Sequence, residues 1–316
     1  MRDCMNEQII VCLEQCSSYE SVKLKEFLRN AFGTAHDFSP RSAKVFIKPN
    51  LISSKGPSLA CTHGSFLLAL GEYLVDNGAQ VTIGDSPAFG NSHSVLRKLG
   101  IDDALSKRGI KIVNLKKVVN RRLDCGVNIG IAAEPLDCDY FVNAPKVKAH
   151  SQMYVTLAVK NIFGIVLGMR KAVLHMLHGG SDNMFSKILV DLLDHLPTHH
   201  FSVIDGVRAM HLTGPIHGRS LDLGCVGFSL DPIALDTSLL HVLELDPAKS
   251  PLWNETRSRG SSGSELSNIH FPMQQPEMFH GSHFQGPDEL SPVRFNPLRF
   301  FWNSIRRAAG YARNGL

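Results

Sequence analysis

Polar residues that can bind anions or move protons recur directly after short apolar runs of this sequence. If those runs are strands of a parallel sheet, their carboxyl ends meet at one edge, where loops join helix N-termini. Residues far apart in the chain would then lie near one another. The residues at these positions are Lys48 and Asn50, Asp85 and Ser86, Lys146 and Lys148, Asp205, and Asp231.

The segment Pro145–His150 holds the densest group of such residues. Lys146, Lys148 and His150 alternate with apolar residues, and alternate side chains of an extended segment point to the same side. Three cationic or titratable groups on one side form a receptor for a phosphate or a carboxylate. The alternative interpretation is the solvated charged face of an edge strand.

A second lysine motif follows shortly afterwards. Lys160 and Asn161 interrupt the otherwise apolar run 159–164. Burying an amine costs free energy unless the amine is paired, so such an interruption indicates a functional role for the lysine. We therefore expect a catalytic role for Lys160, and we expect Asn161 to bind the ligand together with Lys48 and Asn50.

Histidines supply candidates for proton transfer. His175 and His178 have a spacing that places both rings on one face of a helix, where they could bind a metal, although no third ligand is identifiable by spacing. Imidazole titrates near neutral pH, so a proton-transfer role for His150 or His175 is the favoured interpretation.

Carboxylates and a glycine loop complete the candidate site. Asp85 and Ser86 could cap a helix, hold a ligand hydroxyl or bind a metal. Gly214 begins a Gly-Pro-x-x-Gly turn that lets backbone N–H groups approach an anion. We expect Ser86 and Gly214 to contact the ligand. Asp85, Asp205 and Asp231 are candidates for a divalent metal.

The elements that must position these residues alternate along the chain. Apolar runs predict strands, and amphipathic spacing predicts helices. The alternation favours an α/β fold with a mostly parallel sheet and helices on both faces. The predicted strands are 9–13, 44–47, 80–83, 111–115, 140–143, 201–204 and 225–229, and the predicted helices are 21–32, 64–77, 95–107, 186–196 and 234–243.

The composition of the chain changes after the last predicted helix. Residues 1–248 are expected to form the α/β core, and residues 249–293 are rich in Ser, Gly and Pro and are expected to be irregular. Residues 294–316 place apolar side chains opposite several arginines, which predicts a basic amphipathic helix. That helix could dock on the core, or bind a partner or a membrane surface.

Composition limits the class of protein. The chain has 316 residues, 43% of them hydrophobic, and a formal net charge of +4, which is too small to indicate nucleic-acid binding by itself. Its seven scattered cysteines include no CxxC pair, and no signal peptide or apolar membrane span is present. These features favour the cytoplasm. Fingerprints for dinucleotides, P-loop nucleotides, serine hydrolases and zinc proteases are missing.

The ordered series of motifs resembles the domain-of-unknown-function 362 family over residues 8–247. The motifs are KPN at 48–50, GDSP at 84–87, PKVKAH at 145–150, VKNIFG at 159–164, His175, IDG at 204–206, GPIHG at 214–218 and DPIALD at 231–236. The resemblance implies that the polar residues within them, Asp236 included, are the family's motif positions. It implies no reaction.

Two departures from the family pattern matter. Many relatives carry an added ferredoxin-like iron–sulfur module, whose cysteine runs this chain lacks. Cluster binding is therefore not carried over. Relatives also commonly have a proline near the segment Cys61–Gly64, which leaves the role of His63 open.

Three functions are compatible with the sequence. The favoured one is an enzyme that acts on a phosphorylated or carboxylated small molecule, by proton or group transfer, with a divalent metal as a possible cofactor. The second is a redox or metal accessory protein that works with a redox partner. The third is a module that binds nucleic acid or an anionic surface through the C-terminal helix.

Overall fold

The computed structural model describes residues 8–167, 174 and 183–291. The strands are β1 (Ile9–Gln15), β2 (Lys44–Pro49), β3 (Gln80–Asp85), β4 (Lys111–Asn114), β5 (Val118–Arg122), β6 (Asn128–Ala132), β7 (Tyr140–Ala144), β8 (Lys146–His150), β9 (Tyr154–Thr156), β10 (His200–His211), β11 (Arg219–Leu221), β12 (Cys225–Ser229) and β13 (Ile269–His270). The α-helices are α1 (Ser21–Phe32), α2 (Gly64–Asp76), α3 (Ser92–Lys98), α4 (Asp102–Lys107), α5 (Ala158–Ile162), α7 (Met184–Asp191), α8 (Pro232–Val242) and α9 (Pro251–Ser258).

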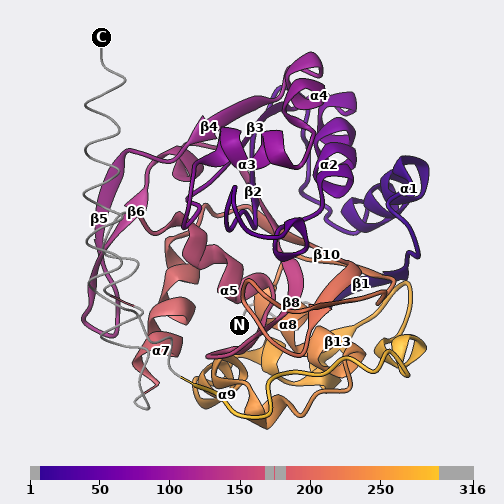
Figure 1. Ribbon diagram of the computed structural model, residues 1–316, viewed down its shortest axis with the longest axis vertical. Coiled ribbons are helices and arrows are strands. Elements are labelled where there is room, and N and C mark those ends of the chain that lie inside the picture. Colours follow the sequence, from indigo (N-terminus) through magenta and orange to yellow (C-terminus); the bar gives the residue numbers. More distant parts are fainter. Residues whose placement is uncertain (1–7, 168–173, 175–182, 292–316) are drawn as a thin grey trace, which may run out of the picture.

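One large sheet organises these elements (Figure 1). Its strand order is β13-β1-β12-β10-β7-β2-β3-β4, and β8 and β11 both pair with β10. The neighbours from β10 to β4 are parallel, which confirms the prediction of a mostly parallel sheet. β12 is antiparallel to both β10 and β1, so its carboxyl end lies at the opposite edge from the carboxyl ends of β2, β3 and β7.

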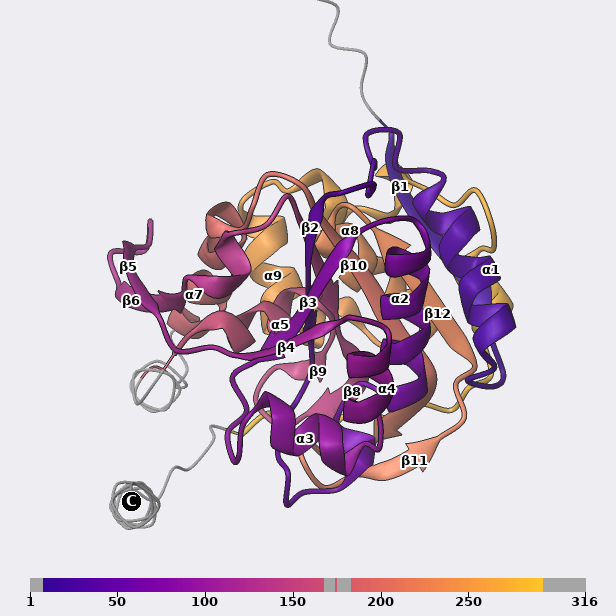
Figure 2. The ribbon, with the colours of Figure 1, turned by 90° about the horizontal axis from the view of Figure 1, so that it is seen from above.

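Helices cover both faces of the sheet, as predicted (Figure 2). Val45 and Ile47 of β2 belong to a hydrophobic cluster that includes residues of α1 and α2. Phe46, whose side chain points the other way, packs in a second cluster with residues of α5 and α7. A third cluster joins α8 to β1, β10 and β12. Both sides of the central strands are therefore buried, which is why those strands read as continuous apolar runs.

Local signals decide where several helices begin and end. The predicted helix 95–107 is two helices, α3 and α4, separated by Gly100 with a φ of +74°. A left-handed residue cannot continue a right-handed helix, and glycine adopts it without steric cost. The hairpin of β5 and β6 was not predicted. Its first strand is largely exposed and polar, so it lacks the apolar run on which strand prediction relies.

The segment after residue 248 is more ordered than its composition indicates. Residues 249–293, which we expected to be irregular from their composition, contain the helix α9, where Ser250 caps the helix and Pro251 occupies its first turn, and the strand β13, which pairs with β1. Leu252 and Phe279 of this segment pack in the hydrophobic clusters of the core. The predicted basic helix 294–316 lies outside the described residues.

A further feature concerns membranes. Within the ranges that the structure describes, no helix combines the length and the apolar composition that crossing a bilayer requires.

Removal of the segment after residue 248 tests its contribution to the core. A chain that ends at residue 248 loses Leu252, Ile269, Phe271 and Phe279 from the buried clusters, and we expect it to lose its cooperative thermal transition. Circular dichroism during heating measures this. A chain that ends at Ser291 is the matched control and is expected to melt like the full-length protein. Equal melting of both truncated chains would contradict the assignment of this segment to the core.

Candidate active site

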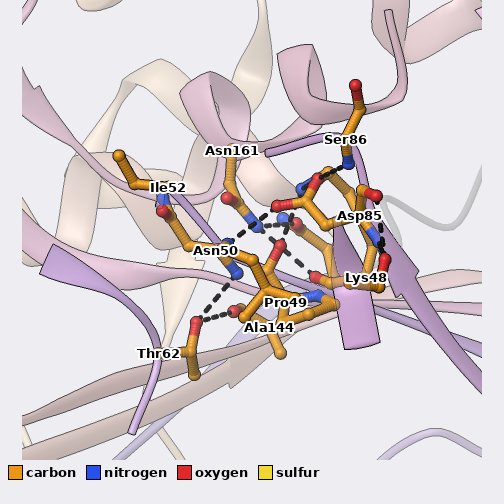
Figure 3. A network of polar contacts seen from close by, with 12 residues as sticks. Lys48, Pro49, Asn50, Ile52, Thr62, Asp85, Ser86, Ala144 and Asn161 are labelled. Carbon is orange, nitrogen blue, oxygen red and sulfur yellow. Dashed lines mark hydrogen bonds and ion pairs between the residues drawn. The ribbon is translucent and has the colours of Figure 1, made fainter. Parts of the chain in front are cut away.

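An ion pair joins the carboxyl ends of β2 and β3. The ammonium of Lys48 lies 3.0 Å from Asp85 Oδ1 and donates a hydrogen bond to the carbonyl of Pro49. Lys48 is completely buried, and burial lowers the pKa of its amine while the carboxylate of Asp85 opposes that shift. Asp85 also accepts the backbone N–H groups of Leu51 and Ser86. Figure 3 shows this network, in which two strand ends and the following loops share one carboxylate.

The motif around Asn161 and Gly164 packs onto this ion pair. Asn161 donates to Asn143 Oδ1 at 2.8 Å and to the carbonyl of Lys48 at 3.4 Å. A Cβ at Gly164 would overlap the ends of the Lys48 and Asp85 side chains. Gly164 is therefore required because the backbone passes very close to the ion pair. Asn161, which we predicted to bind the ligand, instead links the strands β2 and β7 through these two hydrogen bonds.

A second ion pair joins β8 to β10. Lys146 Nζ lies 2.7 Å from Asp205 Oδ2 and 3.0 Å from the hydroxyl of Tyr19, which itself donates to Asp205 Oδ1. Burial lowers the pKa of Lys146, and Asp205 opposes the shift. The ring of His63 stacks on Tyr19 with centroids 3.7 Å apart, and the His63 backbone N–H donates to Asp205.

Lys148 is a third buried amine and differs from the other two. Its Nζ donates to Asn50 Oδ1 at 3.1 Å and to the carbonyl of Ala60 at 2.8 Å, and within the described ranges it forms no ion pair. Burial lowers its pKa to about 7. Proximity to Cys61 and Asp85 opposes the shift, whereas the ammonium groups of Lys146 and Lys48 add to it.

These residues form one group, which we call the lysine cluster: Lys48, Lys146 and Lys148 with Asp85 and Asp205. Lys148 shares β8 with Lys146, and the charges of Lys48, Asp85 and Lys146 act on its amine. Each ion pair carries no net charge. The net charge of the lysine cluster is therefore set by the protonation of Lys148, which the lowered pKa makes variable near neutral pH.

A loop of residues 51–61 covers Lys148. Its two ends are held together, because Asn50 N–H donates to Thr62 Oγ1 and Thr62 N–H donates to the carbonyl of Asn50. Both hydrogen-bond acceptors of Lys148, Asn50 and Ala60, belong to this loop or to its base. Lys148 is 1% exposed, so the predicted anion receptor is buried at this position.

The predicted catalytic residue Lys160 lies on the helix α5. Its ammonium sits over the rings of Phe163 and Phe185, at 4.8 and 5.3 Å from their centroids. Its helix, α5, is held by Asp236, whose carboxylate accepts the N–H groups of Ala158 and Val159. Burial raises the pKa of Asp236 to about 8. Asp236 therefore positions α5, and with it Asn161 and Lys160.

The remaining predicted residues have different surroundings. His150 follows Lys148 on β8 and is buried, and its Nδ1 accepts the N–H groups of Gln152 and Met153. Ser86 is half-buried next to Asp85. Gly214 packs against the backbone of β8, where a Cβ would overlap the carbonyl of Ala149, so packing already accounts for this glycine. His175 and His178 lie outside the described residues.

Asp231 does not join the lysine cluster. It caps α8, accepting the N–H groups of Ile233 and Ala234. The reason is topological: β12 runs antiparallel to β10, so a residue after its carboxyl end lies at the other edge of the sheet. The predicted metal set of Asp85, Asp205 and Asp231 is therefore not assembled. In the described part of the chain, no three His, Cys, Asp or Glu side chains are grouped in a way that could hold a metal ion.

Sequence reasoning missed Tyr19 and left Cys61 and His63 without a role. Tyr19 lies in a loop without a recognisable motif, and only the folded chain brings its hydroxyl to Lys146. The departure from the family pattern at residues 61–64 was a signal for His63, because it marked the loop that ends beside Asp205.

Comparisons with known proteins identify the family of this chain. Residues 45–241 match the family model described as domain of unknown function (DUF362). The thylakoid-associated protein sll1697 of Synechocystis sp. is 30% identical over 301 residues, which cover 94% of this chain and 93% of that protein.

Two solved structures have weaker similarity. A protein from Thermotoga maritima matches with 12% identity and a TM-score of 0.43, over 63% of this chain and 53% of its own. The lactate racemase apoprotein from Thermoanaerobacterium thermosaccharolyticum matches with 12% identity and a TM-score of 0.47, over 75% of this chain and 59% of its own.

Replacement of Lys148 by methionine tests its protonation state. Between pH 7 and 10 the unfolded chain binds a proton at Lys148 that the folded chain does not, so Lys148 makes the free energy of unfolding rise with pH, by up to about 1.4 kcal/mol per pH unit. K148M is expected to lose this contribution, which urea unfolding at several pH values measures. K23M, at an exposed lysine, is the control. An unchanged pH slope in K148M would contradict the assignment.

Replacement of Asp231 by alanine separates capping from ligand binding. We expect D231A to lower the free energy of unfolding by about 1 kcal/mol, because two N–H groups of α8 lose their acceptor. Anion and metal affinities should stay at wild-type values, since Asp231 lies at the other edge of the sheet. Loss of metal affinity without loss of stability would restore the metal-ligand prediction.

Proposed function

Because the chain belongs to the DUF362 family, whose description assigns no reaction, we propose its function from the site itself. It is an enzyme that acts on an anionic small molecule at the lysine cluster. The observation that carries this proposal is the environment of Lys148, a buried amine with neutral hydrogen-bond acceptors and no ion pair within the described ranges. An anion would supply the negative charge that this site lacks.

Charge balance supports an anionic ligand. The two ion pairs of the lysine cluster are neutral, so a protonated Lys148 leaves one uncompensated positive charge in a buried site. A phosphate or carboxylate that binds there favours the ammonium form and repays the cost of burial. The ammonium then stabilises negative charge that develops on the substrate. Ligand binding and proton uptake are thereby coupled.

The other predicted residues have supporting roles in this proposal. His150 occupies the same side of β8 as Lys148, and its Nδ1 accepts the backbone N–H groups of Gln152 and Met153, which fix the orientation of the ring. Asp85 and Asp205 hold Lys48 and Lys146 in place. A possible divalent metal, a redox partner and the nucleic-acid or surface interaction of residues 294–316 stay predictions.

We also propose that the protein works in a reducing compartment such as the cytoplasm. Six cysteines within the described ranges are free thiols, and four of these are buried. Buried free thiols are typical of proteins that are not held together by disulfides.

Calorimetry tests the coupling of anion binding to proton uptake. A thermal-shift screen of carboxylates and phosphates, oxalate and inorganic phosphate included, first selects a binding anion. At pH 7 we expect that anion to bind with uptake of about half a proton per site, measured in buffers of different ionisation heat, because Lys148 is then about half protonated. K148M should lose the proton uptake and at least about tenfold in affinity.

Two results would contradict this proposal. If K148M binds the anion as tightly as wild type, or if wild type binds without any uptake of protons, the lysine cluster is not the anion site. K23M, which removes an exposed lysine of similar chemistry, controls for a general effect of net charge.

A further inference from the structure

We propose that Lys148 is a nucleophile that forms an imine with an aldehyde or ketone bearing a carboxylate or phosphate. This inference rests on the proposed function and names the substrate class of the same site. It begins from the hydrogen bonds of the amine. A neutral amine has two N–H groups and one lone pair, and the described residues supply two acceptors to Lys148, Asn50 Oδ1 and the carbonyl of Ala60. Both N–H groups are then used, and the lone pair is left for a carbonyl carbon.

The other two lysines of the lysine cluster are not equivalent. Lys48 and Lys146 each face a carboxylate, at 3.0 and 2.7 Å, which favours the ammonium form, whereas Lys148 has no such partner within the described ranges. Burial and the two neighbouring ammonium groups lower the pKa of Lys148 to about 7. Desolvation and nearby cations are the means by which proteins make a lysine nucleophilic.

The balanced step uses no redox reagent. The Lys148 nitrogen attacks the carbonyl carbon, a proton passes from nitrogen to oxygen, and the resulting carbinolamine loses water to give the C=N bond. Protonation of the imine by one further proton gives an iminium, which withdraws electrons from the neighbouring carbon. Hydrolysis by water reverses the step and restores the amine.

The charge of the iminium explains why the carbonyl compound should be an anion. An iminium at Lys148 carries the same single positive charge as the ammonium, and this charge is equally buried. A carboxylate or phosphate on the substrate compensates that charge inside the site, whereas a neutral aldehyde leaves it unpaired. The substrate must enter by displacement of loop 51–61, which covers the amine.

Reductive trapping tests this inference on the full-length protein. Glyoxylate, an aldehyde with a carboxylate, is incubated with the protein and sodium cyanoborohydride at pH 7, and the modified lysines are located by peptide mass spectrometry. We expect Lys148 to be modified at least about tenfold faster than the exposed Lys23, because an ordinary amine is almost entirely protonated at that pH. Acetaldehyde at the same concentration should modify Lys148 more slowly than glyoxylate does.

The variant N50D provides a matched control of nearly identical shape. It places a carboxylate where Asn50 Oδ1 accepts from Lys148, so the amine becomes an ammonium in an ion pair. We expect modification at residue 148 to fall at least about tenfold at pH 7, while the circular dichroism spectrum stays that of the wild type.

Two failures can be told apart. If the anion binds with proton uptake but glyoxylate leaves Lys148 unmodified, or N50D reacts as fast as wild type, the imine is wrong and the anion site stands. If no anion binds with proton uptake, the proposed function fails, and selective trapping at Lys148 would then indicate a reactive amine without an anion requirement.

Discussion

The desolvation of three lysine amines at one edge of the sheet is the constraint on which the site depends. Removing an ammonium from water is costly, and the cost is recovered only with a well-placed negative charge or by loss of the proton. Two amines, Lys48 and Lys146, use the first solution with Asp85 and Asp205. The third, Lys148, has neutral acceptors and no carboxylate partner within the described ranges, and burial lowers its pKa to about 7.

The fold makes this arrangement possible because one long strand spans two partners. β10 pairs with β7 through its first residues and with β8 through later ones, so the chain passes from β7 through Pro145 to β8 beside the same strand. Lys146 then lies in register with Asp205. On the other side of β7, β2 places Lys48 next to Asn143, and α5 locks that pairing through Asn161.

The position of the backbone around α5 matters for the lysine cluster as much as the charges do. Gly164 brings the chain after α5 directly onto the Lys48–Asp85 pair, and Asp236 fixes the start of α5 from the opposite helix, α8. Contacts through α5 and Gly164 therefore connect α8 to the lysine cluster. The family motifs that contain Gly164 and Asp236 are explained in this structure by positioning.

Much of the local structure follows from the sequence by itself. Apolar runs and amphipathic spacing predict most central strands and helices, since those patterns report burial on both faces of a sheet. The alternation of Lys146, Lys148 and His150 is also a local property of an extended chain. The sequence likewise identifies strand ends as the place where polar side chains collect, because parallel strands share one edge.

Only the tertiary structure decided which of those side chains meet and what state they are in. Strand direction is a long-range property, so nothing local revealed that β12 is antiparallel and that Asp231 caps a helix at the far edge. The pairing of two lysines with carboxylates, and the hydrogen bonds of Lys148 to neutral acceptors, depend on contacts between residues about 40 to 100 positions apart. Burial and partner together set the charge of an amine, and both exist only in the folded chain.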